Sequence, residues 1–196
     1  MSVLNDIYSQ LALKPPYPDT DFSGKTIIAT GANVGLGKEA VKHFVRLKAE
    51  KVIGAVRSIA RGEAAKAEIE AETKRTGVVD VWELDYSSYA SVKAFAANVA
   101  KLARVDAVVL NAGIATEKFE IFEDNESTIT VNVVSTTLLT LLLLPTLRSF
   151  AAKWDIVPVI SIVSSGVHAY TKFPEWKTPN SLATLNNKKT AVMSDR

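Results

Sequence analysis

Cysteine is absent from the 196 residues of this chain. Disulfide bonds, thiolate metal sites and cysteine nucleophiles are therefore excluded, and the absence is typical of a cytoplasmic protein. A large excess of charge is also missing, because the formal net charge at pH 7 is +2. So small a charge argues against nucleic acid as a partner and against binding to a membrane surface. Residues 1–14 lack both a basic start and a continuous apolar run, so we expect no secretory leader.

Long hydrophobic runs are scarce, and the strongest one extends from Val131 to Leu147. Asn132 and several hydroxyl residues interrupt it, so it falls short of the roughly 20 apolar residues of a confident membrane span. The run therefore predicts a helix buried against a sheet and no membrane span; a membrane segment is the alternative. Hydrophobic residues make up 47% of the chain, which is enough to predict one packed domain.

Segments with strand and helix patterns alternate along the chain. The strand segments are short and rich in valine and isoleucine, which is typical of strands covered on both faces. The alternation predicts an α/β fold, a Rossmann-type doubly wound parallel sheet of five strands, with its ligand at the carboxyl ends of the strands. The expected strands are 26–30, 51–56, 78–84, 106–110 and 156–163, and the expected helices are 36–49, 59–76, 89–103 and 126–152.

Single residues mark several ends of these elements. Gly77 suits the end of the second helix, and Ser87 and Ser88 suit the start of the third. Pro158 cannot donate to a sheet, so it predicts a late start for the last strand.

The most informative segment joins the first strand to the first helix and carries Gly31, Gly35 and Gly37. Gly31 permits a tight turn, Gly35 lets backbone N–H groups approach an anion, and Gly37 lets the helix pack close to the strand. A strand, a glycine-rich turn and a helix N-terminus together favour a phosphate site. Asn33 and Leu36 lie in the same turn and belong to the predicted site.

Arg57 directly follows the second strand, and residues 51–61 contain no aspartate or glutamate. In a dinucleotide-binding fold, an acidic residue near this point holds the ribose hydroxyls of NAD, whereas an arginine accommodates the 2′-phosphate of NADP. The sequence therefore favours NADP, with Lys38 or Arg61 as a second contact to the phosphate. An ordinary surface arginine is the alternative for Arg57.

Two further strand ends carry candidate cofactor contacts. Asp85 follows the third strand and offers a carboxylate to the adenine amino group, or else a partner for the next helix N-terminus. Asn111, Ala112 and Gly113 follow the fourth strand, where small residues let the backbone pass beneath a nucleotide and Asn111 braces the strand end. A simple turn is the alternative for these three.

Together these residues resemble the short-chain dehydrogenase/reductase superfamily, most of all its retinol-dehydrogenase-like and fungal members. The resemblance extends from about Phe22 to Gly166 and implies a Rossmann-type fold, a nicotinamide cofactor and hydride transfer between a carbonyl and an alcohol. The matching stretches are Thr30 to Gly37, Ala55-Val56-Arg57, Leu84-Asp85, Asn111-Ala112-Gly113, Val131-Asn132-Val133 and Ile162 to Ser165.

The same resemblance assigns two catalytic residues. It implies that Asn132 is the buried helix asparagine that holds a proton-relay water, and that the Ser165 hydroxyl orients the substrate oxygen. A polar helix residue is the alternative for Asn132, and a strand-end cap is the alternative for Ser164 and Ser165.

The family pattern breaks after Ser165, where the family places Tyr-x-x-x-Lys for proton transfer. Here Tyr170 has Lys172 two positions later and Pro174 four positions later, which rules it out on motif grounds. Serine alone does not supply proton transfer near neutral pH, because its hydroxyl titrates far too high. Either the catalytic helix lies beyond Arg196, or the chain works without it as a non-catalytic nucleotide-binding module.

The sequence thus predicts a C-terminally incomplete fold in three parts: an N-terminal extension (1–21), an NADP-binding Rossmann domain (22–165) and a loop or tail (166–196). The function that the resemblance implies is NADP-dependent oxidoreduction of a small lipophilic or polyketide-like molecule, with secondary metabolism as one setting; whether this chain is itself an enzyme stays open. No metal is expected. An uncovered sheet face further predicts a homo-oligomer.

Overall fold

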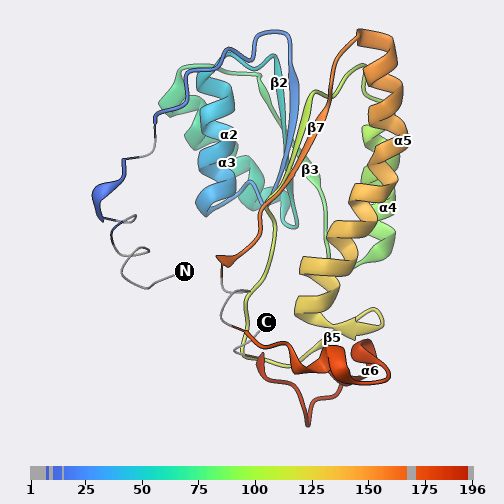
Figure 1. Ribbon diagram of the computed structural model, residues 1–196. Helices are drawn as coiled ribbons and strands as arrows, with labels where there is room; N and C mark the ends of the chain where they lie inside the picture. Colours follow the sequence, from blue (N-terminus) through green and yellow to red (C-terminus); the bar gives the residue numbers. More distant parts are fainter. Residues whose placement is uncertain (1–7, 9–10, 15, 167–170, 194–196) are drawn as a thin grey trace.

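The computed structural model describes residues 8, 11–14, 16–166 and 171–193. A central sheet separates two layers of helices (Figure 1). Helices α2 (Gly35–Arg46) and α3 (Ile59–Thr73) cover one face. Helices α4 (Tyr89–Val99) and α5 (Thr136–Trp154) cover the other. The chain therefore has the three-layer α/β architecture that the sequence predicts.

The sheet has five parallel strands in the order β3-β2-β1-β4-β7. Successive strands are added on one side of β1 and then on the other, so the order reverses between β1 and β4. This reversal is the switch point at which doubly wound sheets bind ligands. The strands are β1 (Thr26–Thr30), β2 (Lys51–Val56), β3 (Val79–Glu83), β4 (Ala107–Leu110) and β7 (Val159–Ile162).

Alternate residues of the central strands point to opposite faces and build two cores. Ile27 packs with Val41 and Ile69, which belong to α2 and α3. Its neighbour Ile28 packs on the opposite face with Phe95 of α4 and the buried leucines of α5. Ile27 and Ile28 are both fully buried, so β1 anchors both layers.

The leucine-rich segment forms one continuous helical path, in which a π-helix, η1 (Ile129–Ser135), leads into α5. Leu139 and Leu143 are fully buried against the sheet, which confirms the predicted packed helix. By length and composition alone, Ile129–Trp154 is apolar enough to cross a membrane, a test that a core helix of a soluble protein also passes.

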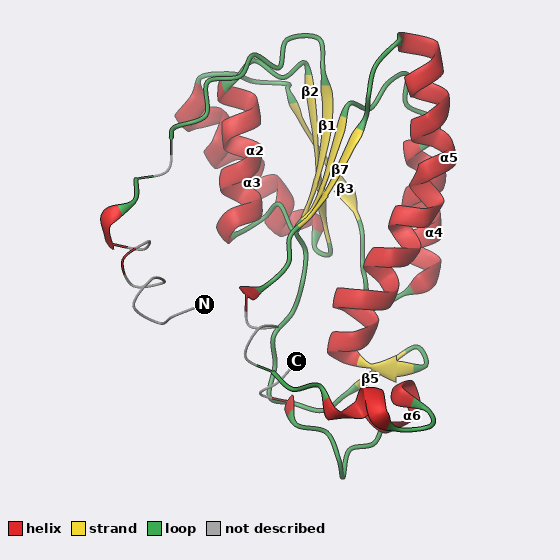
Figure 2. Ribbon diagram, in the orientation of Figure 1, coloured by secondary structure: helices red, strands yellow, loops and turns green. Residues whose placement is uncertain are grey.

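A second region lies beyond the carboxyl ends of the strands (Figure 2). It contains the hairpin of β5 (Ile121–Phe122) and β6 (Asn125–Glu126), and the short helix α6 (Ser181–Leu185). A 3₁₀ turn, η3 (Pro174–Lys177), precedes α6. None of these elements was predicted; the sequence predicted only a loop for the last stretch.

Several predicted ends hold and one is wrong. Ser88 caps α4, because its side chain accepts a hydrogen bond from Ser91 N at 3.3 Å. Strand β7 begins directly after Pro158, as predicted. The end of α3 is different from the prediction: Lys74, not Gly77, takes the left-handed position after the helix. Gly77 also has a positive φ, but its N–H donates to the Glu70 side chain at 2.9 Å.

Candidate functional site

A cavity of about 590 Å³ opens at the switch point between β1 and β4. The carboxyl ends of β1, β2 and β4, the residues after β3 and the β5–β6 hairpin all contribute to its lining. Six of the ten predicted cofactor residues line it, namely Gly31, Asn33, Arg57, Asp85, Ala112 and Gly113. The other four, Gly35, Leu36, Gly37 and Asn111, are not part of the lining.

The floor of the glycine turn is held by contacts between β1 and β4. The Thr30 hydroxyl accepts hydrogen bonds from the N–H groups of Asn111 and Ala112, at 3.0 and 2.9 Å. The Asn111 side chain donates to Thr30 O at 3.0 Å, so Asn111 braces the strand end as predicted. A Cβ at Gly37 would overlap the carbonyl oxygen of Gly31 and lie 2.5 Å from Asn111 Nδ2. Gly37 therefore packs beneath the site and has no room for a side chain.

The turn itself presents backbone N–H groups at the start of α2. Gly31 and Gly35 have φ values of +69° and +58°, which favour glycine. The residue before the helix, Val34, has an apolar side chain that accepts no hydrogen bond from the first turn. Those N–H groups are thus available to an anion, and the positive end of the helix dipole favours one. Leu36, in contrast, is 76% exposed and is not part of the cavity lining.

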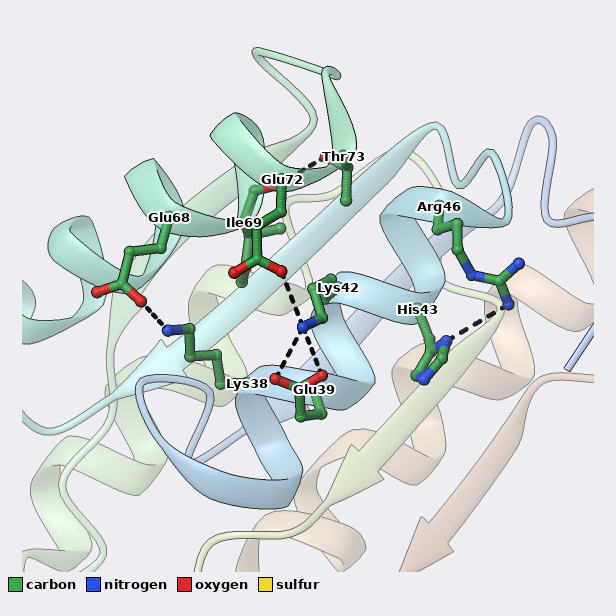
Figure 3. Close-up of polar contacts among 9 residues, drawn as sticks. All are labelled: Lys38, Glu39, Lys42, His43, Arg46, Glu68, Ile69, Glu72 and Thr73. Atoms are coloured by element: carbon green, nitrogen blue, oxygen red, sulfur yellow. Dashed lines mark hydrogen bonds and ion pairs between the residues drawn. The ribbon is translucent and has the colours of Figure 1, made fainter. Parts of the chain in front are cut away.

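Two arginines border the cavity beyond β2. Arg57 is exposed directly after the strand, and Arg61 lies one turn into α3; both line the cavity with Ser58. Lys38 is not in this group, because its ammonium forms an ion pair with Glu68 of α3 (Figure 3). Of the two candidates for a second phosphate contact, the geometry therefore favours Arg61.

The same figure shows a second bridge between α2 and α3. Lys42 contacts Glu39 at 2.7 Å and Glu72 at 2.9 Å (Figure 3). The hydrogen bonds that the Lys42 ammonium donates to Glu39 and then to Glu72 raise the pKa of Lys42. The Lys42–Glu72 pair connects the two helices, whereas the Lys42–Glu39 pair lies within α2; both lie outside the cavity lining.

Asp85 enters the cavity with one carboxylate oxygen already engaged. Its Oδ1 accepts from the backbone N–H of Ser87 at 2.9 Å and from the Ser87 hydroxyl at 2.7 Å. The Asp85 N–H donates to Ser91 Oγ in α4, also at 2.9 Å. These bonds fix the carboxylate at the start of α4, so the two alternatives for Asp85, helix-end partner and adenine contact, are compatible.

Tyr86 is a site residue that the sequence analysis did not identify. Its side chain is 5% exposed, and it lies among both the cavity lining and the core beneath it. Burial raises the pKa of Tyr86 to about 12, against the opposing effect of the Thr30 and Thr136 hydroxyls. No described atom is in hydrogen-bond geometry with the Tyr86 hydroxyl. The sequence shows that a tyrosine directly follows Asp85, but it gives no signal that the side chain of this tyrosine is buried.

The two predicted catalytic residues lie outside the cavity lining. Asn132 is exposed, not buried as expected, and its amide is engaged: Oδ1 accepts from Ile114 N and Nδ2 donates to Ile114 O, both at 2.8 Å. Ser165 is also exposed and follows β7 by three residues. The structure thus gives Asn132 a role in bracing the loop after β4, and the catalytic roles of both residues stay predictions.

The spacing Tyr-x-x-x-Lys does occur once before Ser165, at Tyr89 and Lys93, and the sequence analysis did not consider it. Tyr89 begins α4, its N–H donates to Glu123 Oε1 at 2.8 Å, and its hydroxyl accepts from Asn125 at 3.3 Å. Neither residue lines the cavity, so this occurrence of the spacing lies at the start of α4 and not at the candidate site. Tyr170 lies outside the described residues.

Comparison with known proteins decides the family. The family model described as short chain dehydrogenase matches residues 25–173, which contain the whole five-stranded sheet. This chain belongs to the short-chain dehydrogenase family. Short chain dehydrogenase/reductase dmxR8 of Cryptosporiopsis sp. (strain 8999) is 52% identical over 189 residues, covering 94% of this chain and 58% of the relative. Short-chain dehydrogenase anuD of Penicillium roqueforti (strain FM164) is 46% identical over 196 residues, covering 100% and 51%.

Solved structures of short-chain dehydrogenases share the fold. One from Escherichia coli CFT073, complexed with NADPH, superposes with a TM-score of 0.63 at 27% identity, covering 80% of this chain and 65% of that one. Another from Shigella flexneri 2a str. 301, complexed with NADP, gives 0.63 at 26% identity, covering 79% and 64%. The chain thus spans little more than half the length of the two curated relatives named here and about two thirds of the length of the chains in these two structures.

Proposed function

We propose that this chain binds NADP(H) at the switch-point cavity, as part of an oxidoreductase that interconverts a carbonyl and an alcohol. The substrate that we propose is a small lipophilic or polyketide-like molecule, a choice that rests on resemblance to retinol-dehydrogenase-like and fungal members of the family. The two related structures named above, which are complexes with NADPH and with NADP, support the choice of cofactor.

The observation that carries the proposal is the pair Arg57 and Arg61 at the rim of the cavity. Residues 51–61 contain no carboxylate to hold a ribose 2′-hydroxyl. Two guanidinium groups at this place offer planar donor forks to a 2′-phosphate, which is doubly charged near neutral pH. The cavity therefore has the charge that NADP requires and lacks the group that NAD prefers.

The rest of the cavity fits a dinucleotide. A Cβ added at Gly31 would lie 3.0 Å from Ala112 Cα, so this position favours glycine. Without a side chain there, a pyrophosphate can approach the backbone at the first turn of α2. Asp85 keeps Oδ2 for an adenine amino group, because the two hydrogen bonds from Ser87 use Oδ1. When bound, a nicotinamide cofactor supplies or accepts the hydride. In this proposal Ser165 orients the substrate oxygen and Asn132 supports the proton relay.

A second candidate function is a nucleotide-binding module without turnover. It is favoured by one observation: no Tyr-x-x-x-Lys follows Ser165 within the 196 residues. Without a tyrosine of lowered pKa, proton transfer to the substrate oxygen has no evident donor near neutral pH. An assay of the 196-residue chain with NADPH and a panel of ketones separates the two functions. Clear turnover would eliminate the non-catalytic module.

Calorimetric titration of the chain with NADP and NAD tests the cofactor choice. We expect tighter binding of NADP, and we expect Arg57→Ala to weaken NADP binding by about tenfold or more while leaving NAD binding nearly unchanged. Lys38→Ala is the matched control, because the Lys38 ammonium faces Glu68. Equal affinity for both nucleotides, or an Arg57→Ala variant that binds NADP like the wild type, would refute the assignment.

A further inference from the structure

The β5–β6 hairpin forms one wall of the cavity. Glu120 and Phe122, together with Ser127 directly after the hairpin and Val131 of η1, line the cavity. The hairpin has only two residue pairs, Ile121 with Glu126 and Phe122 with Asn125. A two-stranded ribbon this short is not stable on its own in water, so its position depends on contacts from outside.

Contacts from the core side hold one part of the hairpin. Thr130 of η1 donates its hydroxyl to Phe122 O at 2.7 Å, and Ser127 N donates to Glu120 O at 2.8 Å. At the turn, Glu123 adopts a positive φ of +53° and receives the N–H of Tyr89. These bonds fix the turn and β5, and the Thr130 hydroxyl also reaches β6, where it donates to Asn125 O at 3.2 Å. The backbone N–H of Glu126 in β6 is satisfied from elsewhere.

That remaining contact comes from Asn186, which lies 60 residues further along the chain. Its Oδ1 accepts from Glu126 N at 2.8 Å, and its Nδ2 donates to Asp124 O and to Asn125 Oδ1, both at 3.0 Å. The amide thus uses both of its ends on one hairpin. Asn186 is itself placed by α6, because its N–H donates to Leu182 O at 2.9 Å.

The segment that carries Asn186, residues 171–193, is otherwise attached by little buried surface. Among its described residues, only Leu185, which is 6% exposed, is buried. The Asn186 amide is therefore a principal polar attachment between this segment and the cavity wall. A change in the order of either one is transmitted to the other through these three hydrogen bonds.

We propose that Asn186 is a positioning residue that couples the 171–193 segment to the nucleotide cavity. It acts through the hairpin: the amide holds β6 from the side of the 171–193 segment, and the pairing of β6 with β5 keeps Phe122 in the cavity wall. Because coupling between two sites is reciprocal, nucleotide bound in the cavity also orders the 171–193 segment. This inference rests on the proposed binding of NADP.

Asn186→Ala is the decisive variant, and Asn187→Ala is its matched control. Asn187 is the exposed neighbour, and its side chain accepts only from Lys189 N within its own turn, at 3.0 Å. We expect Asn186→Ala to weaken NADP binding by about threefold to thirtyfold with an unchanged unfolding midpoint. We expect the control to bind NADP like the wild type.

Hydrogen exchange supplies a readout that a merely structural role would not change. In the wild type and in Asn187→Ala, NADP should slow exchange at Thr184 and Asn186 N–H, whose acceptors lie within the segment. In Asn186→Ala this nucleotide-induced protection should disappear. Asn125→Ala removes one of the three bonds, together with the bond from Asn125 Nδ2 to the Tyr89 hydroxyl. It should shift both readouts in the same direction by less, and it serves if Asn186→Ala fails to fold.

Two results would overturn the proposal. One is wild-type NADP affinity and undiminished nucleotide-induced protection in Asn186→Ala. The other is faster exchange throughout the sheet with a lowered unfolding midpoint, which would make Asn186 structural. If the wild-type chain binds no NADP, the proposed function fails. The attachment of β6 by the Asn186 amide is then tested separately by hydrogen exchange of the Glu126 N–H, which should be faster in Asn186→Ala and unchanged in Asn187→Ala.

Discussion

The side-chain amide of Asn132 makes two hydrogen bonds to the backbone of one residue, Ile114. Ile114 directly follows Gly113, and a Cβ at Gly113 would lie 3.1 Å from Asn132 Oδ1. The loop after β4 and the π-helix are thus joined at the edge of the cavity, and the glycine permits their close approach.

Replacing Asn132 by alanine should therefore loosen this loop. The variant leaves the N–H and the carbonyl of Ile114 without their side-chain partner, which costs about 1 kcal/mol of unfolding free energy for a solvent-accessible pair. Urea denaturation followed by circular dichroism measures the loss. Val133→Ala, at the exposed next position, should lie within about 0.5 kcal/mol of the wild type. An Asn132→Ala variant as stable as this control would contradict the bracing role.

Gly37→Ala should be more damaging than alanine at another glycine with open surroundings. The new Cβ overlaps Gly31 O and the Asn111 side chain, so the turn or the strand end must shift; overpacking of this kind costs about 1–3 kcal/mol or more. Gly24→Ala is the comparison, because Gly24 has a φ of +71° but nothing within 4 Å. It should lose only about 1–2 kcal/mol from backbone strain.

The two glycine variants also separate stability from binding. NADP affinity should fall in Gly37→Ala even at a temperature where the variant is fully folded, because the displaced Gly31 carbonyl belongs to the phosphate turn. Gly24→Ala lies before β1 and should bind normally. Equal thermal midpoints for the two variants would show that the turn tolerates the displacement.

The buried carboxylate of Glu126 predicts a dependence of stability on pH. Burial acts to raise its pKa, but hydrogen bonds from Thr128 and Ser127 outweigh burial, and the net pKa is lowered from 4.5. A lowered folded-state pKa means that the stabilisation is complete above the unfolded value and is lost as the pH falls through the folded value. Glu126 should therefore stabilise the protein at pH 5–7 and lose that effect in acid.

Glu126→Gln tests this sign. At pH 7 the variant should be less stable by about 1–3 kcal/mol, since hydrogen bonds to a charged acceptor are replaced by weaker ones. The difference from the wild type should stay constant down to about pH 5 and shrink below about pH 4. Exposed Glu117→Gln is the control and should track the wild type. A difference that grows as the pH falls would show that the pKa of Glu126 is raised.

Exposed apolar residues around β7 predict self-association of the 196-residue chain. Val159 and Ile162 of β7 are 54% and 53% exposed, and Leu141 of α5 is 59% exposed. Beside them lies an apolar hollow of about 340 Å³, lined in part by Leu144 and Ile160. Contiguous apolar surface of this kind typically marks an interface.

Light scattering after size-exclusion chromatography measures the outcome. We expect a dimer or larger species, and we expect the double variant Leu141→Gln, Ile162→Thr to shift it toward monomer. Leu36→Gln, at an exposed leucine of α2, should leave the association unchanged. A wild-type monomer that unfolds cooperatively would contradict this prediction.

The sheet was predictable because its pattern is local and strong. Short valine-rich segments, glycine turns and helix caps such as Ser88 each indicate the same structure, and the alternation of strands and helices indicates parallel strands joined by right-handed crossovers. The order of the strands was not predicted and comes from the structure. The wrong end of α3 shows the limit of this reasoning. Lys74 adopts a left-handed backbone conformation although it has a Cβ, because this conformation is disfavoured but not forbidden for residues other than glycine.

The hairpin and α6 could not be predicted, since both are too short to show a repeating pattern of apolar and polar residues. Strands of two residues show no alternation, and a helix of five residues shows less than two turns. The cap Asn180, whose side chain accepts from Ala183 N at 3.0 Å, was the one local signal for α6. The engagement of Asn132 with Ile114 and the burial of Tyr86 depend on tertiary packing, which sequence spacing does not encode.

The central place of β1 also has a consequence for the growing polypeptide on the ribosome. Ile27 pairs with Val52 on one side, 25 residues later, but its partner on the other side is Ala107. While residues between β3 and β4 are being translated, the first three strands can assemble with one edge of β1 bare. Unpaired edges of apolar strands are templates for pairing with other chains. This interval of translation is where a chaperone would protect the nascent chain most.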